Sequence, residues 1–200
     1  MKRRSLLFDI DIPTGVEVGV GRVLVAEPFL REEFFNHSVV LIVDYAPSES
    51  VMGVVLNNPS EHKLQDLLDG VTVDEPIPVY TGGPIGSDSL YFLHTLGDII
   101  PDAREIAPGI WLGGNFEELF KVINEGYEIE GSVRFFLGYS GWSPGQLEEE
   151  IGRNVWAVAE APQGGELLKG DGTALWHESV RRLGEKFRGW IYHPKNPQAN

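Results

Sequence analysis

The run SVVLIV at residues 38–43 restricts the possible folds of this chain more than any other feature, because every residue after the first is apolar. A strand that alternates apolar and polar side chains buries one face, whereas an unbroken apolar run is typical of a strand covered on both faces. Two further β-branched segments lie at 21–30 and 50–59. We therefore predict three strands, with a turn through Pro47 and Ser48 joining the second to the third.

The rest of the chain mixes strands and helices unevenly. Further strands are expected at 77–82, 90–96, 109–114, 132–139 and 154–161. Helices are expected over 60–70, 114–126 and 173–187, with Ser60, Asn115 and Thr173 as the respective N-caps. Because strands occur both in clusters and singly between helices, the pattern favours an α+β fold with a mixed, strongly bent sheet over a regular βαβ repeat.

The length of 200 residues suits one domain with a sizeable core. We predict an N-terminal segment over 1–20, a single domain over 20–190 and a disordered tail over 191–200, where no apolar period is present. The longest apolar stretch has five residues, VVLIV at 39–43, so no membrane-spanning segment is expected.

The charge and composition of the chain exclude several classes of function. Lys plus Arg is 16 against 30 Asp plus Glu, which gives a formal charge of −14. Since non-specific DNA affinity depends on neutralising phosphates, we expect no specific duplex binding near physiological salt. The absence of cysteine excludes disulfides and thiolate metal sites, and it fits a cytoplasmic protein. The five histidines show no metal-ligand spacing, and we expect no cofactor.

The stretch FFLGYSGWSPGQLEEE at 135–150 carries the densest signal. Its GYSGW segment nearly matches the nucleophile elbow G-x-S-x-G, but Trp142 stands where the tight turn needs glycine. A structural interpretation fits better: Ser143 and Gln146 form a capping box with Pro144 at the first helical position. Tyr139 and Trp142 are then aromatic residues at a tight corner, more typical of a core than of a contact surface.

Three other places invite a functional interpretation. The segment TGGPIGSDS at 81–89 reads as a tight turn before a strand, although a glycine-rich backbone can also form an anion-binding nest. The segment VLNNPS at 55–60 reads as a loop in which Asn57 and Asn58 bond the local backbone. His94 lies within an apolar strand, where a hydrogen-bonded core histidine is more common than a catalytic one.

A resemblance over about residues 20–185 is carried by the segments GRVLVAEPFL, FFNHSVVLIVDY, MGVVLNNP, YTGGPIGSDSLYFLHTL, and FFLGYSGWSPGQLEEEI with NVWAVA. Taken in this order, they are similar to the AlgH/YqgE family, also called UPF0301 or DUF179. The resemblance implies a single domain whose bifurcated sheet is folded into a pseudo-barrel with helices outside. The resemblance implies no established enzymatic reaction. The one functional label of the family is transcriptional regulator of alginate production. His37 and Asn58 stand where the family usually has basic residues, which lowers any expected affinity for anions.

Our leading hypothesis is a non-enzymatic cytoplasmic protein that binds an unidentified protein partner or small ligand in a cleft. Three loops at strand ends, Asn57–Pro59, Gly82–Pro84 and Tyr139–Gln146, would line this cleft and meet at one end of the sheet. The candidate site residues are Asn57, Asn58, Gly82, Gly83, Pro84, His94, Tyr139, Ser140, Trp142 and Gln146. The alternatives are a hydrolase or transferase that uses His94 as general base near Ser140 or Ser143, and a DNA-binding regulator.

Overall fold

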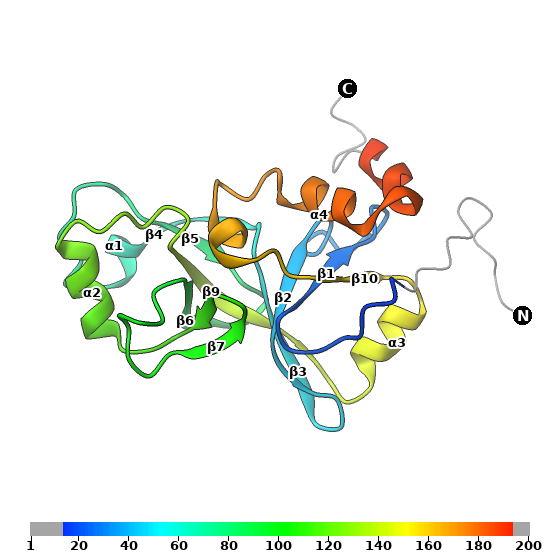
Figure 1. The fold of residues 1–200 in the computed structure, drawn as a ribbon, viewed down its shortest axis with the longest axis horizontal. Coiled ribbons are helices and arrows are strands. Elements are labelled where there is room, and N and C mark those ends of the chain that lie inside the picture. The colour runs from blue at the N-terminus through cyan, green and yellow to red at the C-terminus, as the bar shows by residue number, and fades with distance from the viewer. Residues whose placement is uncertain (1–13, 194–200) are drawn as a thin grey trace, which may run out of the picture.

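The computed structural model describes residues 14–193, so most of the predicted N-terminal segment and tail lie outside the described residues. The strands are β1 (Arg22–Ala26), β2 (Val39–Ala46), β3 (Ser50–Val55), β4 (Pro59–Lys63), β5 (Pro78–Thr81), β6 (Ile85–His94), β7 (Arg104–Ala107), β8 (Ile110–Leu112), β9 (Val133–Trp142) and β10 (Trp156–Glu160). The helices are α1 (Leu64–Leu67), α2 (Phe116–Asn124), α3 (Gln146–Gly152) and α4 (Leu175–Leu183), with 3₁₀ segments η1 (Gly164–Leu168) and η2 (Glu185–Tyr192). Figure 1 shows their arrangement.

The long strand β9 joins the two parts of the sheet. One edge of β9 pairs with β6, while its other edge pairs first with β5 in parallel and then with β3 in antiparallel. The fork lies at Gly82, whose N–H donates to Leu137 O at 2.7 Å and whose carbonyl accepts from Val55 N–H at 2.8 Å. The main path of the sheet runs β10-β1-β2-β3-β9-β6-β8-β7, and Figure 1 shows β9 crossing between its two parts. The predicted mixed, bifurcated and curled α+β sheet in a single domain is confirmed.

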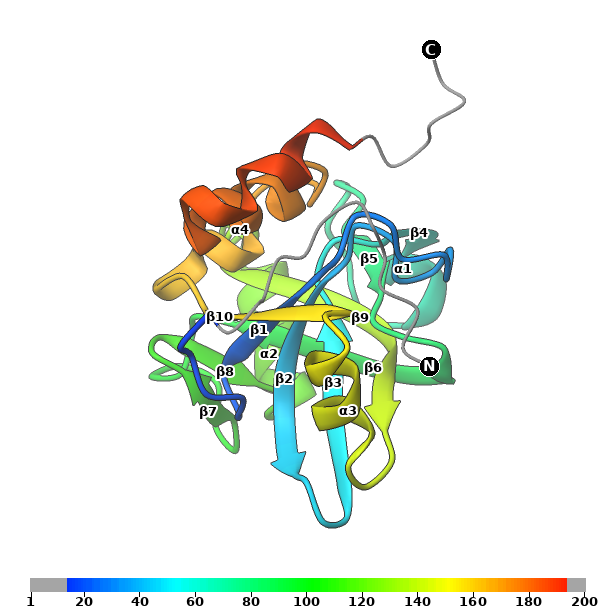
Figure 2. The same cartoon turned by 90° about the vertical axis from the view of Figure 1, so that its right-hand side faces the viewer.

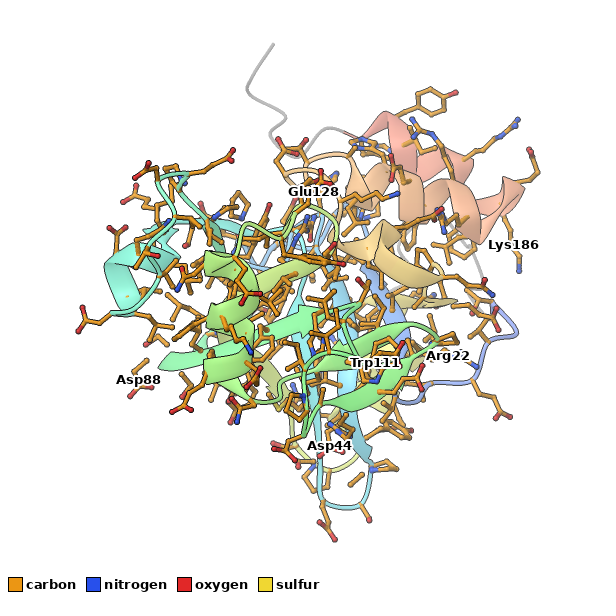
Figure 3. All side chains as sticks on the ribbon, turned by 60° about the vertical axis from the view of Figure 1, so that its left-hand side comes forward. Arg22, Asp44, Asp88, Trp111, Glu128 and Lys186 are labelled. Atoms are coloured by element: carbon orange, nitrogen blue, oxygen red, sulfur yellow. The ribbon has the colours of Figure 1, made fainter. Side chains whose placement is uncertain are left out.

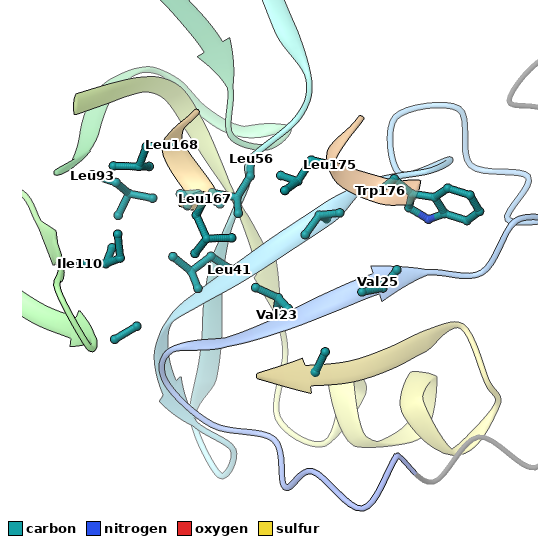
Figure 4. Packing of buried hydrophobic residues seen from close by; sticks show 14 of the residues in the cluster. Val23, Val25, Leu41, Leu56, Leu93, Ile110, Leu167, Leu168, Leu175 and Trp176 are labelled. Carbon is teal, nitrogen blue, oxygen red and sulfur yellow. The ribbon is translucent and has the colours of Figure 1, made fainter. Parts of the chain in front are cut away.

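The sheet is covered on both sides, as the SVVLIV run predicts. Leu41 and Val43 of β2 belong to a core cluster with α4 and the 3₁₀ segments, while Val40 and Ile42 belong to a second cluster with α3. Figures 1 and 2 both show α4 and α3 on opposite sides of the β1–β10 ribbon. Figure 4 shows the first cluster in detail, with Trp176 of α4 packed over the strands. A third cluster lies beneath α2.

The predicted helix over 60–70 is wrong for its first half. Residues 59–63 form β4, which pairs with β5, and only Leu64–Leu67 are helical. Ser60 does not cap a helix; its hydroxyl donates to Val79 O of β5 at 2.6 Å. Tertiary pairing with β5 overrides the local helical pattern here, because the strand offers the backbone of 59–63 a partner that local sequence cannot reveal.

Of the other three predicted caps, Asn115 is confirmed, whereas Ser143 and Thr173 are wrong. Asn115 caps α2 by accepting a hydrogen bond from Glu118 N–H at 3.1 Å. Helix α3 instead begins at Gln146 after Gly145, whose φ of 72° is left-handed, so Ser143 supplies no side-chain cap. One half of its predicted box is present, since Ser143 N–H donates to the Gln146 side chain at 3.0 Å. Helix α4 begins after Ala174, while Thr173 donates to the carboxylate of Asp171.

Candidate functional site

Two of the three predicted loops do meet, through close backbone packing. A Cβ at Gly83 would lie 1.9 Å from the carbonyl carbon of Tyr139, and one at Gly82 would lie 2.4 Å from Gly138 O. The buried Ser140 hydroxyl donates to Gly82 O at 3.2 Å. These glycines therefore allow two segments to touch where a side chain would hold them apart, and Pro84 follows directly before β6.

The two asparagines lie beside this junction. The Asn57 side chain accepts from Val39 N–H and donates to His37 O, each at 2.9 Å, so it fastens the start of β2 as the local-bonding interpretation predicts. The carbonyl of Asn58 accepts from Thr81 N–H at 2.7 Å, directly before Gly82.

Trp142 and Gln146 lie elsewhere, so the predicted meeting is wrong for the end of the Tyr139–Gln146 loop, although Tyr139 and Ser140 at its start do contact Gly82 and Gly83. Trp142 pairs with Val51 at the far end of β3, six residues or about 20 Å from Asn57 at about 3.3 Å per residue. Its indole N–H donates to Glu150 at 2.8 Å, and Gln146 donates to the same carboxylate. The cause is that β9 continues through Tyr139 to Trp142 instead of turning, which carries the end of the motif away.

His94 is a core residue. Its side chain is fully buried, its Nδ1 accepts from Leu96 N–H at 3.1 Å, and its Nε2 lies 2.9 Å from Gly113 O, to which it donates. Burial lowers the pKa of His94, and the Gly113 carbonyl only partly opposes this shift. His94 pairs with Val133, seven residues and therefore about 23 Å along β9 from Ser140. The structure does not bring together the base and serine of the hydrolase alternative.

A cavity of about 790 Å³ lies in another part of the molecule, between β4, β5, the segment after α2 and the end of η1. We call it the Arg134 pocket. Its walls are mainly apolar side chains, contributed by Val73, Ile77, Ile123, Ile129 and Val133. Among the described residues 14–193, none of the ten predicted site residues lines the Arg134 pocket. Pro59, which follows Asn58, does line it.

Arg134 and Tyr80 are buried lining residues of this pocket. Arg134 is 4% exposed, and its guanidinium donates to Leu56 O, Leu168 O and Lys169 O, each at 3.0 Å, and to Gly170 O. It lies over the Tyr80 ring, 4.4 Å from the centroid. Burial lowers the pKa of Arg134, while the charges of nearby groups act in the opposite direction. The guanidinium therefore fixes the segment Lys169–Gly172, here called the strap, against β5 and β9.

Glu130 and Tyr80 also hold the strap in place, through hydrogen bonds to Gly170. Gly170 N–H donates to the Glu130 carboxylate at 2.7 Å, and Tyr80 donates to Gly170 O at 3.4 Å. Asp171 accepts from the backbone and hydroxyl of Thr173, which lowers the pKa of Asp171, and the charge of Arg134 adds to this effect. Beyond the strap lies a second hollow of about 440 Å³, lined in part by the ion pair of Arg182 and Glu166.

Sequence reasoning missed both Arg134 and Tyr80. The one available signal was a single arginine in the otherwise apolar strand run VRFFL at 133–137. A charge in such a strand must find buried partners, since an unpaired buried charge is very costly. Tyr80 had no comparable signal. Within residues 14–193, no cluster of His, Asp and Glu is arranged to hold a metal ion, and no helix is long and apolar enough to cross a membrane.

Comparisons with known proteins identify the family. Residues 23–188 match the AlgH-like family DUF179, and the chain belongs to this family of uncharacterised bacterial proteins. It is 41% identical over 181 residues to a UPF0301 protein of Parabacteroides distasonis and 39% identical over 180 residues to one of Bacteroides thetaiotaomicron, with 90% of each chain covered in both cases.

Two solved structures share the fold. The solution structure of the AlgH protein from Pseudomonas aeruginosa matches with a TM-score of 0.66 at 26% identity, covering 85% of this chain and 92% of that one. The crystal structure of protein DIP2367 from Corynebacterium diphtheriae matches with a TM-score of 0.71 at 24% identity, covering 88% and 93%. The resemblance inferred from the sequence motifs is therefore confirmed.

Proposed function

We propose that this protein is a non-enzymatic binding protein whose ligand is a small organic molecule held in the Arg134 pocket. The observation that carries the proposal is the cavity itself, about 790 Å³ with apolar walls and a few polar groups. Sites for small molecules typically have 300–1,000 Å³ and this kind of lining. Pro59, the last residue of the predicted Asn57–Pro59 loop and the first of β4, lines this pocket, whereas Asn57 and Asn58 do not.

The polar side chains of the pocket support binding rather than catalysis. Nucleophilic or acid–base catalysis needs a nucleophile and a base within hydrogen-bond reach. Among the described residues, no two lining side chains are hydrogen-bonded to each other: Ser60 donates to a backbone carbonyl, and Glu130 accepts from a backbone N–H. A cytoplasmic location remains our expectation, based on the absence of cysteine.

A pocket-filling variant tests the proposal. Val73 lines the pocket and is half-buried, whereas the neighbouring Thr72 is exposed and does not line it. Nile red, a neutral apolar dye, is titrated into wild type, Val73→Trp and Thr72→Trp while its fluorescence is recorded. We expect saturable binding to wild type and Thr72→Trp, and at least about a tenfold loss in Val73→Trp because an indole occupies the cavity.

The proposal is contradicted if wild type gives no saturable binding, or if folded Val73→Trp binds the dye as well as Thr72→Trp does. Urea unfolding of each variant shows whether it is folded. Ile129→Trp, which fills the cavity from the segment after α2, provides a second version of the test if Val73→Trp does not fold.

A further inference from the structure

The mouth of the Arg134 pocket carries more carboxylates than cationic groups. The acidic lining residues are Glu75, Glu128, Glu130 and Asp171, and all four are exposed. None of them belongs to an ion pair among the described residues. Figure 3 shows Glu128 at the surface, in the segment that follows α2. The mouth therefore presents negative charge to an incoming molecule.

The positive groups of the pocket do not balance this charge. Arg134 is buried and directs its guanidinium at four backbone carbonyls, three of them in or next to the strap. The other cationic lining residue is Lys63, on the exposed strand β4. The charge of Arg134 acts on Glu130 and Asp171 and partly balances these two carboxylates. Four lining carboxylates still exceed the two lining cations, Arg134 and Lys63, so an anionic ligand at the mouth would meet net repulsion.

We propose that the pocket selects an organic cation, an amine or guanidinium carried on an apolar body; this inference rests on the proposed function. The apolar body would lie on Val73, Ile77 and Ile129, and the charge would remain at the mouth beside Glu75 and Glu128. There the cation stays in contact with water, so it gains attraction without the cost of burial. The formal charge of −14 on the whole chain also raises the local concentration of cations.

Three probes with the same eight-carbon chain separate charge from apolar contact: octylamine, which is protonated at pH 7, neutral 1-octanol and anionic octanoate. Their affinities are measured by isothermal titration calorimetry at low ionic strength. We expect octylamine to bind most tightly and octanoate most weakly, and we expect the preference to shrink as salt is added.

A charge-matched pair of variants tests whether the mouth itself is responsible. Glu75→Gln/Glu128→Gln removes two carboxylates that line the pocket, whereas Asp74→Asn/Glu125→Gln removes two exposed neighbours that do not. Both change the formal charge from −14 to −14 + 2 = −12. The lining variant should lose about fivefold in octylamine affinity, as expected for two exposed ion pairs. The control should lose less than about twofold.

The outcomes distinguish this inference from the proposed function. If all three probes bind with equal affinity, or if both double variants weaken octylamine equally, the selection of cations is contradicted while the pocket remains a binding site. If none of the three probes binds and Nile red does not bind either, the proposed function itself is contradicted. Octylamine binding that is unaffected by Glu75→Gln/Glu128→Gln also overturns the inference.

Discussion

Replacing Arg134 with methionine tests whether this side chain builds the pocket. Methionine keeps much of the chain's length but removes every hydrogen bond of the guanidinium. The bonds to Leu56 O and Leu168 O are buried, whereas water can reach the carbonyls of Lys169 and Gly170. Two buried carbonyls without partners cost about 1–3 kcal/mol each. Removing a desolvated cation offsets part of this cost, so we expect a loss of about 3 kcal/mol in the free energy of unfolding.

The assay is urea unfolding followed by tryptophan fluorescence, with hydrogen exchange on the strap amides. Arg134→Met should lower the midpoint without changing the m-value, and the amides of Lys169–Gly172 should exchange faster than in wild type. Arg153→Met is the control, because the Arg153 side chain is exposed and its one ion pair among residues 14–193 is a surface pair with Glu149. It should change stability by less than about 1 kcal/mol. An Arg134→Met protein as stable as the control, with unchanged strap exchange, would refute the structural role.

Three further predictions concern the residues singled out from the sequence. Trp142→Ala should cost about 3–5 kcal/mol, because Trp142 is 4% exposed and its indole bonds Glu150; a loss below about 1 kcal/mol in urea unfolding would contradict its place in the core. Gly83→Ala should cost at least about 3 kcal/mol, since its Cβ would lie 1.9 Å from the Tyr139 carbonyl carbon, and near-wild-type stability would show that the segments do not touch. The ring of His94 should titrate below pH 6.5 in NMR spectra, because burial lowers its pKa. The stability gained by burying the neutral ring is therefore fully present above about pH 6.5 and is lost as the pH falls, because the unfolded chain then binds a proton more readily. A ring midpoint at or above 6.5 would be inconsistent with the buried, neutral imidazole.

The fold could be predicted from the sequence in those segments where the pattern of apolar residues shows which side chains are buried. The run at 39–43 predicts a strand covered on both faces, and Leu41 and Ile42 do belong to clusters on opposite sides of β2. Asn115 caps α2 because a cap depends on contacts within four residues. The strand β4 was missed because its stability depends on β5, which local sequence does not show.

The candidate site was harder to predict, because the most distinctive residues serve packing. Gly82 and Gly83 allow backbone segments to touch, and Trp142 fills a core. The pocket instead depends on Tyr80 and Arg134, which are 54 positions apart and meet only because β5 pairs in parallel with β9. Such a pairing leaves no local pattern, apart from the single charge of Arg134 within an apolar strand.

Methyl NMR of a bound probe shows directly whether the Arg134 pocket holds a small molecule. Protein with labelled Ile, Leu and Val methyl groups is titrated with Nile red. We expect saturable shifts at Ile77, Ile129 and Val133, which line the Arg134 pocket, and none at Ile42, which belongs to the core cluster beneath α3. Saturable binding that shifts Ile42 and leaves the three pocket residues unchanged would contradict this expectation.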